Sequence, residues 1–111
     1  MTTSVIMPAY NSAAYIAAAI ASVVAQSEPD WELIVSDDGS RDDTVAIVQQ
    51  AAASDPRIRL LTGASNRGPA QARNAAIAAA RGRYIAFLDS DDLWKPEKLA
   101  RQLAFMQARD I

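Results

Sequence analysis

Four short apolar runs alternate along this chain with segments whose apolar residues recur at helical spacing, and this alternation restricts the fold most strongly. The apolar runs, each short enough to be a buried strand, lie at residues 4–7, 31–36, 58–62 and 84–88. Helical spacing follows each run: after Asn11 or Ser12, over 42–53, over 69–81 and from about Pro96. Such alternation predicts an α/β fold, with a mostly parallel sheet covered by helices on both faces.

Single residues indicate where these elements end. Pro8 lacks a backbone N–H, so we expect the first strand to end there. Ser40 and Asp43 have the spacing of a capping box for the second helix. Gly82 is placed to end the third helix in a left-handed conformation. The run at 58–62 alternates apolar and polar residues, which indicates a strand near the sheet edge.

Length and composition exclude several classes of function. The 111 residues predict a single domain, and a net charge of -2 predicts no basic surface for nucleic acid. The chain has no cysteine for disulfides or thiolate metal sites and no histidine to act as a general base near neutral pH. With no apolar segment of membrane-spanning length and no signal-peptide pattern, we expect a cytoplasmic protein, with the inner face of the membrane as a further location.

Three aspartates, Asp89, Asp91 and Asp92, follow the fourth apolar run directly. Carboxylates this close repel one another unless a cation or hydrogen-bond donors offset their charge. Because ligands of a parallel sheet bind at the carboxyl ends of its strands, we expect a divalent cation or a phosphate group at Asp89 or Asp91. The structural alternative is that Asp91 or Asp92 caps a helix that contains Pro96 in its first turn.

The first two strands also end in residues that could contact a ligand. Pro8, Ala9 and Tyr10 follow the first strand, where the Tyr10 ring could lie against a flat nucleobase or could complete the core. Asp37 and Asp38 follow the second strand. A carboxylate there could accept hydrogen bonds from a base or a ribose, and one of the two could instead form an Asx-type turn.

The third helix carries Arg73 near its N-terminus, and together they form a candidate anion site. The alternative is that Arg73 ties the helix to a neighbouring loop.

Candidate contacts for a base, for phosphate and for a metal ion therefore lie on one edge of the sheet, and together they indicate a nucleoside diphosphate with a cation. The chain has no Gly-x-Gly-x-x-Gly sequence and no P-loop. It therefore lacks the phosphate-binding loops on which a dinucleotide-binding protein or a nucleotide triphosphatase depends.

Four motifs, in this order, resemble those of family 2 glycosyltransferases of the GT-A fold. They are SVIMPAYN at residues 4–11, VSDDGSRDDT at 35–44, NRGPAQARN at 66–74 and LDSDDLW at 88–94. The resemblance covers nearly the whole chain. It implies a Rossmann-like GT-A fold, a nucleotide-sugar donor with a UDP-sugar as the expected one, a divalent cation (Mn²⁺ or Mg²⁺), and inversion at the anomeric carbon.

The resemblance also implies a role for individual residues. Pro8 and Tyr10 would border the base, and Asp38 would accept a hydrogen bond from its ring N–H. Arg73 would lie near the nucleotide and Asp89 would face the ribose. The expected nucleotide-binding residues are Pro8, Ala9, Tyr10, Asp38, Arg73, Asp89 and Ser90, and the expected metal ligand is Asp91.

One departure from the family pattern bears on activity. Enzymes that resemble this chain continue well beyond this length, and their catalytic base, an Asp or Glu, comes from the later half. We therefore expect residues 1–111 to form the N-terminal donor-binding portion, without the acceptor-binding half and with little or no transfer activity alone. The acceptor, a saccharide or a lipid-linked group, is not specified. An uncovered sheet edge would favour a homo-oligomer.

Three other functions fit parts of the pattern. An aspartyl-nucleophile phosphatase also places Asp-x-Asp after an apolar strand, as at 89–91, but there the motif opens the fold. A response-regulator receiver pairs acids after a strand but needs a phosphoacceptor aspartate where Thr62 and Gly63 stand. A non-catalytic nucleotide-binding or assembly module stays open, and its signature would be cation-dependent binding without turnover.

Overall fold

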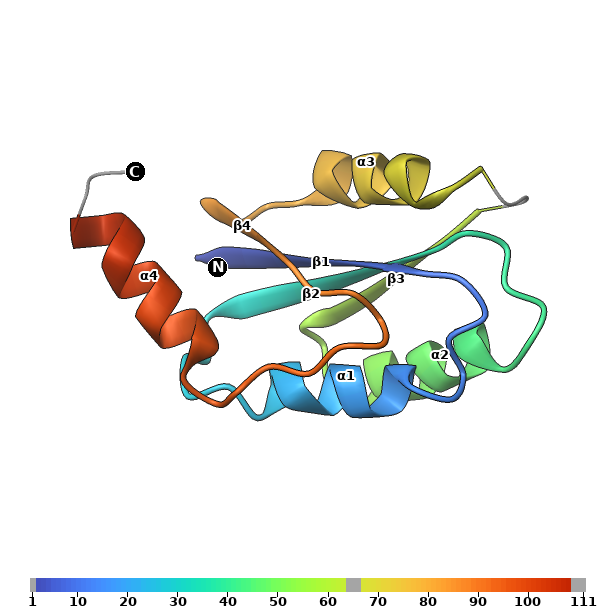
Figure 1. Cartoon of the computed structure of the whole chain (residues 1–111), viewed down its shortest axis with the longest axis horizontal. Coiled ribbons are helices and arrows are strands. Elements are labelled where there is room, and N and C mark those ends of the chain that lie inside the picture. Colours follow the sequence, from blue (N-terminus) through green and yellow to red (C-terminus); the bar gives the residue numbers. More distant parts are fainter. Residues whose placement is uncertain (1, 64–66, 109–111) are drawn as a thin grey trace.

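The computed structural model describes residues 2–63 and 67–108, and its elements alternate between strand and helix throughout (Figure 1). The strands are β1 (Thr3–Ala9), β2 (Trp31–Asp37), β3 (Ile58–Thr62) and β4 (Tyr84–Phe87). The helices are α1 (Ile16–Val24), α2 (Thr44–Ser54), α3 (Pro69–Ala79) and α4 (Lys98–Ala108). All neighbouring strands pair in parallel, in the order β3-β2-β1-β4, so the predicted parallel α/β fold is confirmed.

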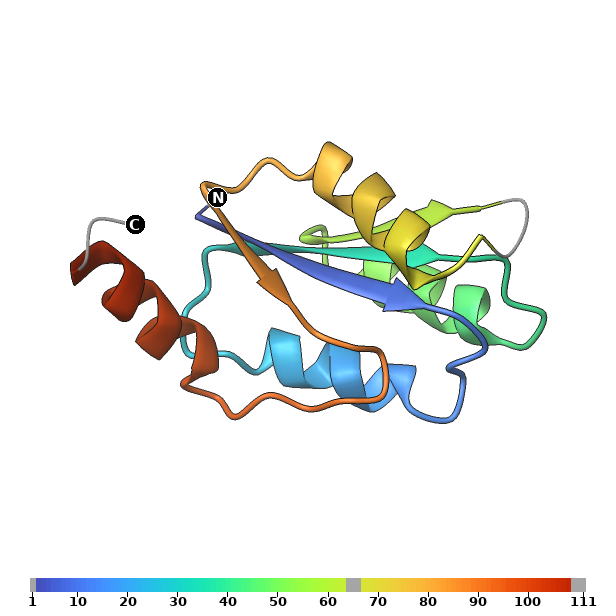
Figure 2. The ribbon, with the colours of Figure 1, turned by 45° about the horizontal axis from the view of Figure 1, so that its top comes forward.

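The sheet lies between two helical layers, with α1 and α2 on one face and α3 on the other (Figures 1 and 2). Side chains alternate along β1, so that Val5 and Met7 join the larger core cluster with α1 and α2, whereas Ile6 joins a smaller cluster with Ala76 of α3. Each central strand is therefore apolar on both faces. This explains why the apolar residues in the runs at 4–7 and 31–36 follow one another directly instead of alternating with polar residues.

The first strand continues through Pro8, where we expected it to end, and stops one residue later at Ala9. The N–H of Leu88 donates to the carbonyl of Ile6, so the next bond of this ladder would run from residue 8 to the carbonyl of Leu88. Proline cannot make that bond. Pro8 is tolerated in β1 because β4 has already ended at Phe87 on that side.

The β4 strand is an edge strand rather than the buried strand that its apolar sequence predicted. It ends at Phe87, and the side chain of Phe87 is 52% exposed. The opposite edge is β3, as the alternating sequence at 58–62 predicted.

The capping box predicted for the second helix does not form. Ser40 donates its hydroxyl proton to Asp37, and α2 begins at Thr44 rather than near Asp42. Asp42 accepts hydrogen bonds from both the N–H and the hydroxyl of Thr44. Asp43, the residue before the helix, makes no capping hydrogen bond with its side chain.

Gly82 does not adopt the predicted left-handed conformation, and α3 ends earlier than predicted, at Ala79. Gly82 is constrained instead by close packing, because a Cβ atom there would lie 2.6 Å from the backbone nitrogen of Ser4 and 2.8 Å from the carbonyl carbon of Thr3. The Gly82 N–H donates to the hydroxyl of Ser4 at 2.7 Å. The requirement for glycine therefore comes from the first strand, 78 residues away in the sequence.

The buried carboxylate of Glu32 fastens the end of α3 to the sheet. It accepts hydrogen bonds from the Ser4 hydroxyl at 2.6 Å, from the Arg81 N–H at 2.6 Å and from Arg59 at 2.9 Å. Arg59 in turn donates to the carbonyl of Ala79, the last residue of α3. This network places α3, and the residues it carries, relative to the strands.

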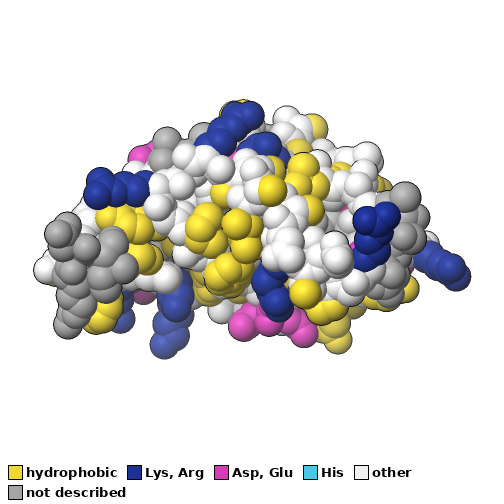
Figure 3. All heavy atoms as spheres, turned by 90° about the horizontal axis from the view of Figure 1, so that it is seen from above, with side chains coloured by type: hydrophobic (Ala, Val, Ile, Leu, Met, Phe, Trp, Pro, Cys, Tyr) yellow, Lys and Arg dark blue, Asp and Glu magenta, His cyan; other side chains and the backbone are white. Residues whose placement is uncertain are grey.

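The fourth helix begins at Lys98, so neither Asp91 nor Asp92 caps it, and the capping alternative for these aspartates is wrong. The side chain of Gln26 holds its first turn instead, accepting from the Leu99 N–H and donating to the Lys95 carbonyl. None of the helices in the described part of the chain is long and apolar enough to cross a membrane. On the face covered by α3, Lys and Arg side chains lie in several separate places rather than in one continuous patch (Figure 3).

Candidate functional site

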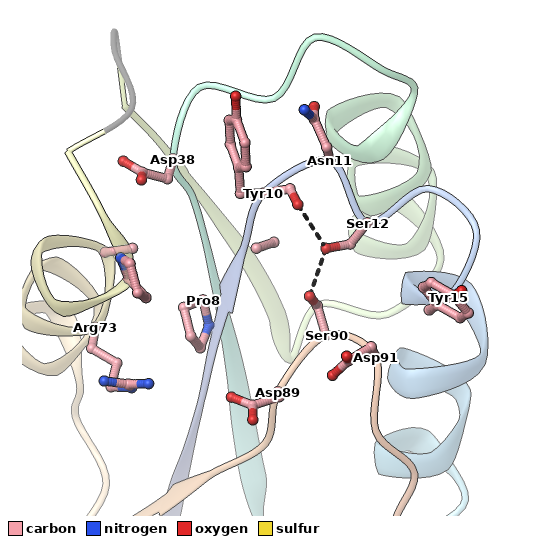
Figure 4. A pocket seen from close by; sticks show the side chains of 13 residues that line it. Pro8, Tyr10, Asn11, Ser12, Tyr15, Asp38, Arg73, Asp89, Ser90 and Asp91 are labelled. Carbon is pink, nitrogen blue, oxygen red and sulfur yellow. Dashed lines mark hydrogen bonds between the residues drawn. The ribbon is translucent and has the colours of Figure 1, made fainter.

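A cavity of about 500 Å³ lies where the carboxyl ends of β1, β2 and β4 meet the N-terminus of α3 (Figure 4). The eight residues that the sequence predicted for the site all line it: Pro8, Ala9, Tyr10, Asp38, Arg73, Asp89, Ser90 and Asp91. These residues come from four segments that are far apart in the sequence. The parallel arrangement brings them together because it places the carboxyl ends of all strands along one edge.

The loop after β1 presents the Tyr10 side chain at the cavity, where it is 43% exposed. The neighbouring Asn11 has a left-handed backbone, with φ of 48°, which asparagine adopts more readily than most residues. Its side-chain oxygen accepts from the Arg41 N–H, and its own N–H donates to the hydroxyl of Ser40. These bonds hold the loop against the segment that follows β2, so Tyr10 projects from a fixed backbone.

The two aspartates after β2 have different surroundings. Asp37 accepts from the N–H groups of Gly39 and Ser40, so it forms the Asx-type turn that was the structural alternative for this pair. Asp38 lines the cavity, and its two oxygens accept from the N–H groups of Arg67 and Gly68 at 2.9 and 2.7 Å. A carboxylate has about four lone-pair positions, so Asp38 keeps capacity to accept from a ligand as well.

The N-terminus of α3 forms the opposite wall, with Pro69, Ala72 and Arg73 facing the cavity. Figure 4 shows the Arg73 guanidinium extending into the space beside Pro8. Among the described residues, the Arg73 side chain has no hydrogen bond or ion pair with a neighbour, so they do not support its alternative role as an internal tie. A helix N-terminus and a guanidinium both favour anions, which makes this wall suited to phosphate. Asn66, which opens the third sequence motif, lies outside the described residues.

The loop after β4 supplies three consecutive residues to the cavity, Asp89, Ser90 and Asp91. The two aspartates are exposed, whereas Ser90 is only 8% exposed and lies 2.6 Å, oxygen to oxygen, from the hydroxyl of Ser12. The Asp92 N–H closes a turn by donating to the Asp89 carbonyl. The carboxylates therefore flank a serine whose side chain turns back into the protein (Figure 4).

A divalent cation fits this site only if the ligand supplies part of its coordination. No group of three acidic side chains able to hold a metal occurs within residues 2–63 and 67–108. Asp91 offers an exposed carboxylate on the cavity wall, and oxygen is the donor that Mg²⁺ and Mn²⁺ prefer. These cations often bind one or two protein carboxylates and complete their shell with water and phosphate oxygens. The donor set present here fits that arrangement.

Five further residues line the cavity, and the sequence analysis did not assign them to the site: Asn11, Ser12, Tyr15, Pro69 and Ala72. The sequence offered Asn11 and Ser12 as helix caps, and Asn11 also as part of the first motif, but α1 begins at Ile16 and its preceding residue makes no side-chain cap. Their position directly after Tyr10 was the signal that could have identified them.

Comparison with known proteins gives one consistent family. The profile described as "Glycosyl transferase family 2" matches residues 4–111. The chain is 48% identical, over 97% of its length, to the UDP-Glc:alpha-D-GlcNAc-diphosphoundecaprenol beta-1,3-glucosyltransferase WfgD of Escherichia coli. It is 52% identical, over 88% of its length, to the succinoglycan biosynthesis protein ExoO of Rhizobium meliloti. The chain spans 42% of the first relative and 28% of the second.

Solved structures agree with these sequence relatives. The structure of S. aureus TarS 1-349 in complex with UDP has a TM-score of 0.91 at 35% identity, covering 97% of this chain and 32% of that one. The mannosyltransferase PcManGT from Pyrobaculum calidifontis, in complex with GDP-Man and Mn²⁺, has a TM-score of 0.88 at 30% identity, covering 94% of this chain and 32% of that one.

Proposed function

The chain belongs to glycosyl transferase family 2, and on that premise we propose that it forms the donor-binding part of an inverting glycosyltransferase. The observation that carries this proposal is the cavity, which gathers an aromatic ring, a cationic helix end and three carboxylates at one sheet edge. This combination suits a nucleoside diphosphate sugar with a divalent cation better than it suits a phosphomonoester, which offers no base for the ring and Asp38 to recognise.

The proposed donor is a UDP-sugar. Pro8 and Tyr10 border the base, and Asp38 accepts a hydrogen bond from its ring N–H. TarS, a structural neighbour, was solved with UDP and with UDP-GlcNAc, which supports uracil, whereas PcManGT was solved with GDP-Man. Asp38 is already bonded to the loop before α3, so binding of the base at Asp38 would also act on that loop.

The other end of the cavity takes the ribose and the diphosphate. In this proposal Asp89 faces the ribose, with Ser90 next to it on the same loop, Arg73 lies near the nucleotide, and Asp91 holds Mn²⁺ or Mg²⁺ on the diphosphate. The cation would neutralise charge on the departing diphosphate. The Mn²⁺ in the PcManGT complex supports a cation in this role.

The base that deprotonates the acceptor lies outside residues 1–111 in this proposal. The carboxylates lining the cavity are Asp38, Asp89 and Asp91, and each already has a role in donor binding. The 111-residue chain should therefore bind donor but transfer little sugar. The acceptor is a saccharide or a lipid-linked group, and the relative WfgD, whose name includes a diphosphoundecaprenol acceptor, supports the second.

The proposed location is the cytoplasm, at the inner face of the membrane, where a lipid-linked acceptor would be reached. Fractionation of cells into soluble and membrane material checks this.

We also propose that the chain forms homo-oligomers, because β4 is an uncovered edge strand that exposes Phe87.

Calorimetry of UDP binding, with Mn²⁺ and with EDTA, tests the donor proposal. We expect Mn²⁺ to increase the affinity of the wild-type chain for UDP, and Asp91→Asn to abolish that increase. Asp38→Ala should instead weaken binding of uridine, which carries no phosphate and needs no metal, by about tenfold, as expected for loss of a hydrogen bond to a charged group.

Two controls separate these effects from general changes of charge. Asp92→Asn removes the same charge one residue from Asp91 but lies outside the cavity, and Asp43→Ala alters an exposed aspartate that caps nothing with its side chain. Both should bind UDP as the wild type does. Equal loss of the Mn²⁺ effect in Asp91→Asn and Asp92→Asn, or wild-type binding that ignores Mn²⁺, would contradict the proposal.

A further inference from the structure

Two serines that are 78 residues apart form a buried hydrogen bond in the wall of the cavity. The hydroxyl oxygens of Ser12 and Ser90 lie 2.6 Å apart, and each residue is 8% exposed. The Ser12 hydroxyl also lies 3.3 Å from the carbonyl oxygen of Tyr10 and donates to it. A hydroxyl has one proton and two lone pairs, so Ser90 donates to Ser12 while Ser12 donates to Tyr10 (Figure 4).

The Ser12 end of this pair belongs to a loop with further anchors. The Ser12 N–H donates to the hydroxyl oxygen of the buried residue Thr44 at 2.8 Å. The next N–H, that of Ala13, donates to Asp42 at 3.2 Å. The loop after β1 is therefore bound to the start of α2, independently of Ser90.

The Ser90 end has fewer anchors. Among hydrogen bonds between described residues, the Ser12–Ser90 bond is the one that joins the segment 89–93 to another part of the chain. The other bonds of that segment are internal, from the Asp92 N–H to the Asp89 carbonyl and from the Leu93 N–H to the Asp92 side chain. Asp89 and Asp91 both carry negative charge next to Ser90, and their mutual repulsion favours spreading of this loop.

We propose that Ser12 and Ser90 are positioning residues that set the distance between the base end and the cation end of the donor site. This inference rests on the proposed function. Ser90 then contributes through the placement of Asp91 rather than by contact with the nucleotide, because its hydroxyl is turned into the protein. Tyr10 and Asp91 are coupled through three consecutive oxygen atoms, those of Tyr10, Ser12 and Ser90.

The test compares Ser12→Ala, Ser90→Ala and the double variant with Ser54→Ala, an exposed serine at the end of α2. Calorimetry measures binding of uridine and binding of UDP, with Mn²⁺ and with EDTA. We expect each single variant to reduce the Mn²⁺-dependent gain in UDP affinity about threefold to tenfold, the effect of one hydrogen bond, with uridine affinity unchanged within twofold. Because Ser12→Ala already removes the bond that the two serines share, the double variant should lose no more than Ser12→Ala alone.

A second measurement needs no metal and no ligand. Hydrogen exchange of the Asp92 amide reports on the turn that carries both aspartates, and we expect it to accelerate in Ser12→Ala as well as in Ser90→Ala but not in Ser54→Ala. Ser12 lies on a different loop, so a purely local effect of Ser90 cannot produce this result.

Three outcomes overturn the inference. One is an unchanged Mn²⁺-dependent gain in both single variants while the wild type shows the gain, which leaves the donor proposal intact. Another is an Asp92 amide that exchanges at the wild-type rate in Ser12→Ala. The third is a wild-type chain without any Mn²⁺-dependent gain, which removes the donor proposal and this inference together.

Discussion

The Glu32→Gln substitution should strongly destabilise the protein, although glutamine and glutamate have nearly the same size and shape. One carboxylate oxygen of Glu32 accepts from both the Ser4 hydroxyl and the Arg81 N–H, and the other accepts from Arg59. Glutamine has one acceptor oxygen and one donor NH₂ group. In either orientation its NH₂ group therefore faces a donor, and Glu32 is only 1% exposed, so water cannot relieve the conflict.

The expected loss of unfolding free energy is about 2–4 kcal/mol. A hydrogen bond to a charged group contributes roughly 1.5–3 kcal/mol, and a buried donor left without an acceptor costs about 1–3 kcal/mol. The ion pair with Arg59 adds little beyond its hydrogen bond, because the Arg59 side chain is 29% exposed. For a domain of this size the loss corresponds to a fall in Tm of roughly 8–15 °C.

The destabilisation should depend on pH in one direction. Burial raises the pKa of Glu32, but hydrogen bonds from Ser4, Arg81 and Arg59 outweigh it and leave the pKa below its ordinary value. A carboxylate whose pKa is lower in the folded state stabilises fully above its unfolded pKa and loses this contribution as pH falls through the folded value. The difference between wild type and Glu32→Gln should therefore be constant near neutral pH and shrink below about pH 4.

Urea unfolding followed by circular dichroism measures this difference at several pH values. Glu97→Gln is the matched control, because it removes the same charge from an exposed residue just before α4 and should leave stability within about 0.5 kcal/mol of wild type. If Glu32→Gln also stayed within that range, or if its deficit grew on acidification, our account of the Glu32 network would be refuted.

Two further predictions concern the close packing of Gly82 and the edge strand. Gly82→Ala should cost about 1–3 kcal/mol in urea unfolding, because its Cβ would lie 2.6–2.8 Å from Ser4 and Thr3, and a stability equal to wild type would contradict the close approach. Sedimentation of the wild-type chain should show homo-oligomers, because the edge strand β4 exposes 52% of Phe87. The Phe87→Lys variant should dissociate into monomers. A wild-type chain that stays monomeric at high concentration would exclude the proposed oligomer.

The order and type of the elements were predictable from the sequence because they depend on local periodicity. Runs such as 84–88 are apolar over a strand's length, and the alanine-rich segments between the runs favour helix. The edge position of 58–62 followed from its alternating pattern. The candidate site was predictable for a topological reason: once the strands are parallel, residues after different strands, such as Tyr10 and Asp91, must meet at one edge.

Element ends were predicted less well, because residues distant in the sequence determine them. Pro8 remains in a strand because its neighbour β4 ends early, and Gly82 is required by the backbone of Ser4 rather than by a helix cap. Ser40 has the spacing of a capping residue, yet its hydroxyl bonds to Asp37. For Pro8 and Gly82 a tertiary contact replaced the local rule, whereas for Ser40 a different local bond replaced the predicted cap.

Asp37 and Asp38 illustrate what only the tertiary structure decided. They are adjacent, chemically identical and both buried, so no local rule distinguishes the turn-forming carboxylate from the one that lines the cavity. Their partners distinguish them, since Asp37 bonds within its own turn and Asp38 bonds to Gly68, 30 residues away. The sequence determines which side chains follow each strand and are therefore available to the site. Hydrogen bonds, however, depend on distance and direction in space. Which carboxylate lines the cavity is therefore settled only when the chain has folded.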